Sequence, residues 1–258
     1  MEREIIEKAK VQFGRQAERY AESRPHATGT SLDLMVEWAR PKPTDRVLDV
    51  ATGTGFTAFT FADFARRVVA TDVTASMLTQ AHRLAGERKL TNLLYSLAEA
   101  EALPFRDGVF DIATSRLAPH HFGSVPRFLG EMYRVLKPGG AFVLCDSSTP
   151  EGPDTSAWQQ ETELIRDPSH VRNHSPGEWT RMTEEAGFHV ERVNSNHRSK
   201  LTFSDWVRTS GNDPATVMLL RERYLRASPS VRDAFRIRFE GDEIHFSWML
   251  AILLARRG

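Results

Sequence analysis

Short apolar segments alternate with helix-like patterns along residues 46–147. Each apolar segment is short enough to be a buried strand, and apolar residues recur with helical spacing between the segments. The strand-like segments cover residues 46–52, 67–73, 93–97, 110–116 and 141–147. This alternation of strands and helices predicts a parallel sheet that is covered by helices on both faces.

Three regions depart from this alternation. Two helical patterns precede the first strand and predict a cap of helices within residues 1–40. Residues 148–176 are polar and predict a helical insertion that lies off the core, and residues 197–234 carry two further helical patterns. We interpret both insertions as lids on a single domain that spans residues 1–258.

Strands return between and after the two insertions. A helix is expected over residues 176–186, and a strand is expected over residues 189–193. Residues 235–257 predict two strands joined by the turn Glu-Gly-Asp-Glu. The longest apolar run, residues 246–255, falls well short of the ~20 residues that span a bilayer, so we expect a buried strand and no membrane span.

The composition narrows the classes of function. The 258-residue chain balances 34 basic residues with 34 acidic ones. A nucleic-acid binder normally uses a positive field to collect phosphates, so we expect no nucleic-acid partner. The single Cys145 cannot form an intramolecular disulfide, and the charged N-terminal residues do not look like a signal peptide. These features predict a cytoplasmic protein in which Cys145 is an inert core residue.

The most informative segment is V-L-D-V-A-T-G-T-G over residues 47–55, where a strand runs into a glycine-containing turn and then a helix. Glycine permits positive φ and close approach of a ligand, and the helix N-terminus offers free amide donors. Asp72 follows Gly55 by 17 residues and ends the next strand. Its carboxylate can accept hydrogen bonds from both hydroxyls of a ribose, so the segment predicts a nucleoside-binding βαβ unit.

Other classes share part of this pattern. Gly53, Gly55 and Ala58 also satisfy the dinucleotide-binding spacing, so a nicotinamide-dependent oxidoreductase is the main alternative enzyme. That class would also need a hydride-transfer set such as Tyr-x-x-x-Lys. Amino-directed nucleic-acid methyltransferases carry an Asn/Asp-Pro-Pro-aromatic tetrapeptide after the fourth strand, where this chain has S-R-L-A-P-H.

Three motifs stand together in the first 145 residues. They are L-D-V-A-T-G-T-G over 48–55, A-L-P-F-R-D-G-V-F-D over 102–111, and R-V-L-K-P-G-G over 134–140. With Asp49 before the glycines and Glu99 after the third strand, the chain resembles the class I S-adenosylmethionine-dependent methyltransferases. The resemblance is to the small-molecule branch that includes the ubiquinone and menaquinone biosynthesis enzymes, and it runs from about Phe13 to Cys145.

This resemblance implies a fold, a cofactor and a reaction. The fold is a doubly wound α/β sheet of seven mostly parallel strands, with an antiparallel C-terminal strand and helical lid insertions. The cofactor is S-adenosyl-L-methionine, and its methyl group passes by in-line displacement to a small-molecule acceptor, with oxygen or carbon favoured as the acceptor atom. A module that binds the cofactor without catalysis stays open, and a homodimer is one assembly that we consider.

The resemblance also assigns cofactor-binding positions. Asp49 and the loop from Ala51 to Gly55 would hold the methionine end, and Asp72 would hold the ribose. Ala51 replaces a glycine that many relatives carry, and alanine disfavours the positive φ that glycine permits. Glu99 replaces the usual aspartate near the adenine amino group. The full expected set is Tyr20, Asp49, Ala51, Gly53, Gly55, Asp72, Val73, Met77, Glu99, Ala100, Ser115 and Arg116.

Histidines supply the candidates for contact with the acceptor. His120 and His121 directly follow the fourth strand, where an open α/β sheet binds ligands, so either is a candidate general base or a loop-holding residue. His170 and Arg172 in the first insertion are candidate substrate contacts, and Arg172 could bind a carboxylate or phosphate. His170 and His174 have the spacing of a metal pair, but no matching cysteine or carboxylate accompanies them, so no metal is expected.

Aromatic residues in the cap and the second insertion have two interpretations each. Phe13, Tyr20 and His26 lie in a segment that in this kind of methyltransferase folds over the cofactor, although helix packing would also explain Phe13 and Tyr20. In the second insertion, Phe203 and Trp206 could either line an acceptor pocket or pack the insertion onto the domain.

Overall fold

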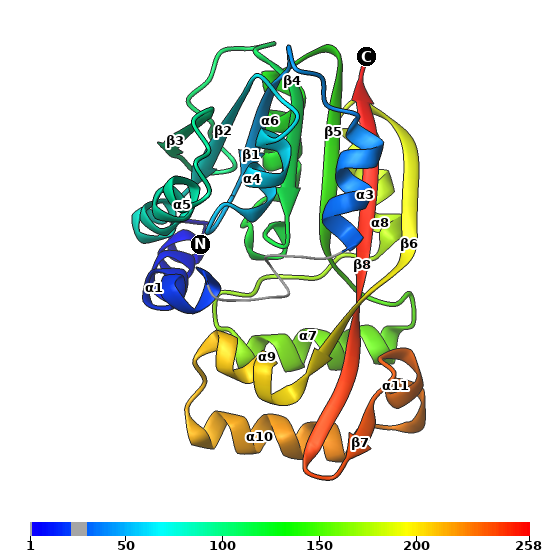
Figure 1. The fold of residues 1–258 in the computed structure, drawn as a ribbon. Helices are drawn as coiled ribbons and strands as arrows, with labels where there is room; N and C mark the ends of the chain where they lie inside the picture. The colour runs from blue at the N-terminus through cyan, green and yellow to red at the C-terminus, as the bar shows by residue number, and fades with distance from the viewer. Residues whose placement is uncertain (1, 22–29) are drawn as a thin grey trace.

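The strands predicted for the first half of the chain lie side by side in one sheet (Figure 1). We describe the protein from a computed structural model, and the description covers residues 2–21 and 30–258. In this part of the chain eight strands pair in the order β3-β2-β1-β4-β5-β8-β6, and β7 pairs with β8. The strands are β1 (Arg46–Val50), β2 (Arg67–Asp72), β3 (Leu93–Leu97), β4 (Phe110–Arg116), β5 (Leu136–Ser148), β6 (Phe188–Thr202), β7 (Arg238–Glu240) and β8 (Glu243–Arg257).

Strand directions confirm the expected doubly wound, mostly parallel sheet. Strands β1 to β5 pair in parallel with one another. Strand β8 runs antiparallel to both β5 and β6, which places an antiparallel strand inside the sheet. The sheet of the described residues has one strand more than the expected seven. The additional strand is the short β7, which is the first arm of the predicted C-terminal hairpin. Gly241, with a φ of 59°, lies in the turn between the arms.

Helices cover both faces of the sheet because successive strand residues alternate between two apolar cores. On β1, Val47 packs with the face covered by α3 and α4, and Leu48 packs with the face covered by α6 and α8; both side chains are fully buried. The helices that flank the sheet are α3 (Thr30–Ala39), α4 (Phe56–Ala62), α5 (Ala75–Glu87), α6 (Val125–Val135) and α8 (Pro176–Glu185). Helix α1 (Glu2–Ala21) packs against α5.

Strands β6 and β8 are longer than most of the parallel strands and extend past them to a second group of helices, which we call the second helical layer (Figure 1). This layer consists of α7 (Pro153–Arg166), α9 (Phe203–Ser210), α10 (Pro214–Leu225) and α11 (Pro229–Ala234). Its core is aromatic: Trp206, Tyr224, Phe246 and Trp248 are all buried together. Phe203 and Trp206 therefore pack this layer and do not line the cavity described below.

Two boundaries differ from the sequence-based expectation. Strand β6 extends to Thr202 instead of ending near residue 193, because it pairs with β8 along its length although it is an edge strand with mostly polar side chains. In the first insertion, the helix ends at Arg166, and residues 167–175 form a loop. This loop does not lie off the core, because Ser148 donates a hydrogen bond to the carbonyl of His174 (2.8 Å) and Asn173 is buried.

No helix within residues 2–21 and 30–258 has the length and apolar character that a bilayer crossing requires.

Candidate functional site

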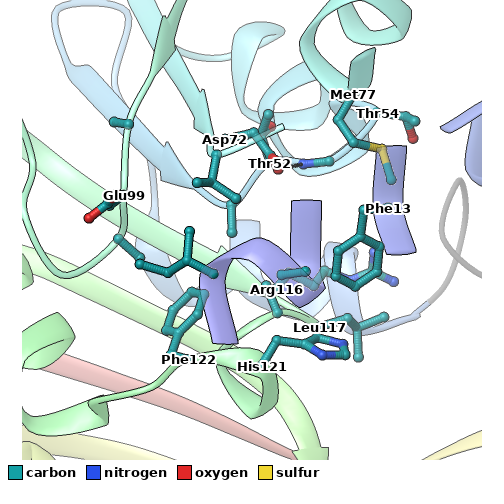
Figure 2. Close-up of a pocket in the computed structure, with 18 of the residues that line it drawn as sticks. Phe13, Thr52, Thr54, Asp72, Met77, Glu99, Arg116, Leu117, His121 and Phe122 are labelled. Carbon is teal, nitrogen blue, oxygen red and sulfur yellow. Dashed lines mark hydrogen bonds between the residues drawn. The ribbon is translucent and has the colours of Figure 1, made fainter. Parts of the chain in front are cut away.

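A cavity lies at the carboxyl ends of β1 to β4, where an open α/β sheet places its ligands. Helix α1 closes one side of it (Figure 2). Five segments line the cavity: α1, the loop after β1, the end of β2 with the start of α5, and the segments after β3 and β4. The lining residues are Ile6, Ala9, Phe13, Tyr20, Ala51, Thr52, Gly53, Thr54, Phe56, Thr57, Asp72, Val73, Met77, Ala98, Glu99, Ala100, Glu101, Arg116, Leu117, Ala118, His121, Phe122 and Gly123.

The loop after β1 has the left-handed backbone that its glycines predicted. Gly53 has a φ of 55° and Gly55 has a φ of 94°. A Cβ on Gly55 would lie 2.5 Å from the ring of Phe59, so this position also needs the absence of a side chain. Ala51 has a φ of 54° as well. The alanine therefore adopts the conformation that it disfavours, at a cost of about 1–2 kcal/mol.

Asp72 ties this loop to the neighbouring strand. Its two carboxylate oxygens accept hydrogen bonds from the backbone amides of Gly53 (2.9 Å) and Thr74 (2.8 Å). Burial raises the pKa of Asp72, against the effect of these hydrogen bonds. Each carboxylate oxygen keeps a further lone pair, so Asp72 can also accept hydrogen bonds from a ligand in the cavity.

Three predicted cofactor residues lie behind the cavity surface. Asp49 is fully buried, and its oxygens accept hydrogen bonds from the hydroxyls of Thr52 (2.6 Å) and Thr114 (2.7 Å). Burial raises the pKa of Asp49 to about 6, and these hydrogen bonds oppose the rise. Ser115 donates to the carbonyl of Val50 (3.0 Å). Asp49 and Ser115 thus support the loop from below, and Gly55 is the loop residue before α4; all three are absent from the lining.

The other predicted cofactor positions do line the cavity. Val73 and Met77 form an apolar wall next to Asp72, and Glu99 and Ala100 follow β3. Figure 2 shows Asp72, Met77 and Glu99 at the cavity. Arg116 ends β4, and its Nε donates to the hydroxyl of Ser31 (3.3 Å); burial lowers its pKa. The remaining predicted positions in the lining are Tyr20, Ala51, Gly53 and Asp72.

Helix α1 brings aromatic residues to the cavity. The ring centroid of Phe13 lies 5.7 Å from that of Tyr20 and 4.8 Å from that of His121. Burial raises the pKa of Tyr20 to about 12, so its hydroxyl stays protonated at neutral pH. Phe13 and Tyr20 pack against neighbouring rings, and both also line the cavity. Helix packing and a position at the cavity are therefore combined in these two residues. His26 lies outside the described residues.

The two adjacent histidines have different positions. His121 lines the cavity, and its Nδ1 lies 3.0 Å from the carbonyl oxygen of Ser169. His120 is absent from the lining, and its Nδ1 lies 2.7 Å from Oδ1 of Asp146. Their ring centroids are 4.2 Å apart. The sequence singled out both histidines, and the structure separates the one at the cavity from the one behind it.

The residues predicted in the first insertion lie away from the cavity lining. Arg172 is exposed and pairs with Glu178, so it points to the surface. His170 is buried, and its Nε2 lies 2.9 Å from Oε1 of Gln160. His174 packs its ring against Trp179 with centroids 5.1 Å apart. Within residues 2–21 and 30–258, no three His, Cys, Asp or Glu residues gather closely enough to hold a metal ion.

The nicotinamide alternative would need a hydride-transfer pair at the cavity. Tyr133 and Lys137 have the Tyr-x-x-x-Lys spacing, but neither lines the cavity. Tyr133 packs on Phe188 with ring centroids 5.1 Å apart, and Lys137 forms an ion pair with Asp111 (2.6 Å). The cavity therefore lacks this pair.

Sequence reasoning missed several residues of the site. Asp146, which holds His120, lies inside an apolar strand and could have been noticed as a single carboxylate in the run A-F-V-L-C-D-S-S. Leu117 and Phe122 line the cavity on both sides of the histidine pair. No periodic pattern marks them, because they belong to the irregular segment after β4.

Comparisons with known proteins agree with this geometry. The family described as Methyltransferase domain matches residues 48–144. The uncharacterized methyltransferase YcgJ of Bacillus subtilis strain 168 is 31% identical over 242 residues, which cover 94% of this chain and 95% of YcgJ. The crystal structure of YcgJ matches with a TM-score of 0.81 and 31% identity, covering 88% of this chain and 97% of that one.

Two further relatives extend the comparison. The structure of BH2331 from Bacillus halodurans C-125 matches with a TM-score of 0.84 and 33% identity, covering 89% of this chain and 99% of that one. The ubiquinone/menaquinone biosynthesis C-methyltransferase UbiE of Dinoroseobacter shibae is 37% identical over 124 residues, which cover 47% of this chain and 50% of that protein. The full-length matches show that the chain belongs to the class I S-adenosylmethionine-dependent methyltransferases, whose cofactor is S-adenosylmethionine.

Proposed function

We propose that this methyltransferase transfers the methyl group to an oxygen or carbon atom of a small, largely apolar acceptor that carries an acidic hydrogen. One observation carries the proposal: His121 lines the same cavity as the glycine loop and Asp72. A proton acceptor and a nucleoside-binding loop therefore face one space. The C-methyltransferase activity named for the partial relative supports carbon as one of the two acceptor atoms.

The lining residues fit the cofactor. Asp72 offers carboxylate lone pairs for the ribose hydroxyls, and the apolar side chains of Val73 and Met77 suit the faces of an adenine ring. Glu99, after β3, places a second carboxylate at this end of the cavity as an acceptor for the adenine amino group. The buried Asp49 holds the loop through Thr52, so we assign it a supporting role toward the methionine end.

The chain's own residues orient the acceptor and manage its proton. When bound, S-adenosylmethionine supplies a methyl group whose bond to sulfur breaks, with the electron pair staying on sulfur, as the acceptor atom bonds to the methyl carbon. Ile6, Ala9 and Phe13 on α1 present apolar surface that excludes water from the cavity. We assign His121 the role of general base for the acceptor's proton.

The tautomer of His121 suits that role. A carbonyl oxygen only accepts hydrogen bonds, so Nδ1 of His121 carries the hydrogen that it donates to Ser169. Its Nε2 therefore keeps a lone pair. Burial, followed by the charge of His120, lowers the pKa of His121, so the ring is neutral at physiological pH.

The walls near the histidine favour an apolar acceptor. Leu117 and Phe122 flank His121, and Phe13 packs against its ring. We propose that the segments over 1–40, 148–176 and 197–234 act as the cap and lids of this single domain. Arg172 and His170 then belong to the lid and reach the acceptor only if the loop over residues 167–175 moves, because neither lines the cavity.

A product-release assay tests the proposed function. Formation of S-adenosylhomocysteine is measured with a panel of phenols, quinone precursors, amines and thiols. We expect turnover with hydroxylated or carbon-acid acceptors of apolar character. Turnover restricted to amines or thiols would contradict the proposed acceptor atoms, and cofactor binding by calorimetry without turnover on any acceptor would indicate a binding module.

A further inference from the structure

A buried acid and histidine form a pair behind the cavity. His120 lies in the short helix η1 (Pro119–His121) after β4, and Asp146 lies near the end of β5. The side chain of Asp146 is fully buried, and its Oδ1 is 2.7 Å from Nδ1 of His120. Among the described residues, Oδ2 of Asp146 has no hydrogen-bond partner. An ionised carboxylate in such a place is stabilised mainly by positive charge on His120.

Two further histidines lie against this pair. The ring centroid of His120 is 4.2 Å from that of His121 and 5.6 Å from that of His170. Positive charge on one ring therefore disfavours a proton on the other two. Nε2 of His170 lies next to the amide oxygen of Gln160, and Nδ1 of His121 lies next to the carbonyl oxygen of Ser169. Each of these two rings has a hydrogen-bond acceptor that suits a neutral tautomer.

Among the described residues, no charged group on the neighbouring elements replaces Asp146 as a hydrogen-bond partner of these rings. The other charged groups that act on the three histidines are Glu163 and Arg166 on α7 and Asp167 in the loop after α7. His174 acts on Asp146 from the same loop, and Tyr20 on α1 acts on Arg166. Glu163 forms an ion pair with Arg166 (3.2 Å), and Asp167 accepts hydrogen bonds from Ser169. Within the part of the chain that the structure describes, Asp146 is the carboxylate that hydrogen-bonds to a ring of this cluster.

The directions of the pKa shifts agree with this arrangement. Burial alone would lower the pKa of His120, but the charge and hydrogen bond of Asp146 raise it above the ordinary value. Burial, and then the charge of His120, lower the pKa values of His121 and His170. His120, beside Asp146, is therefore the most basic of the three rings and the preferred position for a positive charge in the cluster.

We infer that Asp146 is a positioning residue that keeps a proton on His120, so that His121 stays neutral with its Nε2 lone pair available to the acceptor. This inference rests on the proposed function, because it concerns the base of the proposed reaction. Without Asp146, the proton would move between the adjacent rings, and a protonated His121 could not take a proton from the acceptor.

The proton that the acceptor releases passes to His121 and then to water. The acceptor's O–H or C–H bond breaks as its oxygen or carbon bonds to the methyl carbon, and the released proton forms a bond with Nε2 of His121. Two adjacent imidazolium rings repel each other, so His121 releases this proton to water when the product leaves. The ring is then neutral again, and His120 has kept its proton throughout.

The test is the variant Asp146→Asn, whose side chain has the same shape and can still accept the hydrogen bond from His120. Loss of the carboxylate charge lowers the pKa of His120, and loss of the neighbouring positive charge raises the pKa of His121. We expect the acid limb of the kcat/KM profile, which requires a neutral His121, to move to higher pH by about one unit. We expect the affinity for S-adenosylhomocysteine to stay unchanged, because Asp146 does not line the cavity.

Asp205→Asn is the matched control, because Asp205 is exposed and forms an ion pair with Arg208 on the same helix, α9 (2.8 Å). It should leave the pH profile where it is in the unaltered protein. In Asp146→Asn, an acid limb that does not move shows a purely structural role and overturns the inference. A limb that moves to lower pH makes His120 the base and overturns it as well.

A second measurement does not depend on the variant or on turnover. Nitrogen-15 NMR of the imidazole rings in the unaltered protein reports the protonation state of each histidine. We expect a doubly protonated His120 and a neutral His121 with hydrogen on Nδ1 at pH 7. A neutral His120 at pH 7 would overturn the inference even if the enzyme is active. If no acceptor is methylated, the proposed function fails, but a charged His120 beside a neutral His121 would still support the electrostatic role of Asp146.

Discussion

The two sides of the cavity are built in different ways. The glycine-loop side comes from one continuous strand–turn–helix–strand unit, residues 46–72, and much of its shape is backbone: the φ values of Gly53 and Gly55 and the amide that Gly53 donates to Asp72. The histidine side consists of side chains brought together from distant segments. His120 and Asp146 are 26 residues apart, and His121 and Ser169 are 48 residues apart.

Because the two sides are built differently, substitutions in them should have different effects. A backbone-built loop is tied to local sequence and binds through fixed amides and one carboxylate, so changes there should act on cofactor affinity and on stability. A side-chain cluster depends on the charge of each ring, so changes there should act on rate and on its pH dependence. Substitutions on each side can therefore test whether the two sides control affinity and rate separately.

The largest effect is expected at the histidine side. The substitution His121→Ala removes the proposed base, and we expect kcat/KM to fall by about 10²- to 10⁴-fold while cofactor affinity stays unchanged. Turnover is measured with the best acceptor of the panel, and binding is measured by calorimetry. His189→Ala is the control, because His189 is an exposed residue of β6. Equal activity in both variants would show that no base acts at this position.

On the glycine-loop side, Asp49 should make stability depend on pH. Its pKa in the folded protein is about 6, against 3.8 as the ordinary value, so the folded state binds this proton more tightly than the unfolded state does. Its contribution to stability is therefore full below pH 3.8 and is lost as the pH rises through 6. The loss amounts to about 3 kcal/mol.

Chemical denaturation of the unaltered protein and of Asp49→Asn at several pH values measures this contribution. The unaltered protein should lose stability relative to the variant between pH 4 and pH 7. The control is Asp242→Asn, at an exposed aspartate in the turn before β8. A difference in unfolding free energy that does not change across this window would show that Asp49 keeps an ordinary pKa.

A smaller effect is expected from Asp72→Ala. We propose this side chain as the carboxylate acceptor for the ribose, and a hydrogen bond to a charged group contributes about 1.5–3 kcal/mol, so affinity for S-adenosylhomocysteine should fall by roughly 10- to 100-fold. Asp154→Ala, at an exposed position of α7, should leave this affinity unchanged. Unaltered affinity in Asp72→Ala would place the ribose elsewhere in the cavity.

The smallest effect should be a gain in stability. Ala51 has a φ of 54°, which glycine adopts without the penalty that a Cβ brings, so Ala51→Gly should stabilise the fold by about 1 kcal/mol. Ala215→Gly is the opposite control, because Ala215 lies in the first turn of α10 and glycine destabilises helices. Thermal unfolding with both variants measures the two signs. A lower melting temperature for Ala51→Gly would show that the alanine conformation carries no strain.

The same contrast explains what the sequence could predict. Gly53, Asp72, Val73 and Met77 were assigned to a cofactor cavity, and the structure places all four in its lining. The spacing of the strand–turn–helix–strand unit over residues 46–72 predicted Gly53 and Asp72, and the resemblance to the methyltransferases implied Val73 and Met77, which follow that unit. Ala51 illustrates a limit of this reasoning, since its residue type alone does not reveal that the loop forces it into a positive φ.

The histidine side was predicted less completely because its partners come from tertiary packing. Asp146 gains its role from contact with His120, and no local pattern connects the two. Arg172 was predicted as an acceptor contact, yet the structure pairs it on the surface with Glu178. Glu178 is held there by the capping box that it forms with Ser175 at the start of α8. A charge in a polar segment can find such a partner nearby, which the sequence alone does not show.

Strand β8 also has a consequence for synthesis of the chain. Its apolar residues complete both the sheet core, through Leu253, and the aromatic core of the second helical layer, through Trp248. Neither core can close on a ribosome before residues 243–257 emerge. More than two hundred residues, including the five strands β1 to β5 that pair in parallel in the finished sheet, must therefore wait in an incomplete state, which is the condition in which nascent chains most need chaperones.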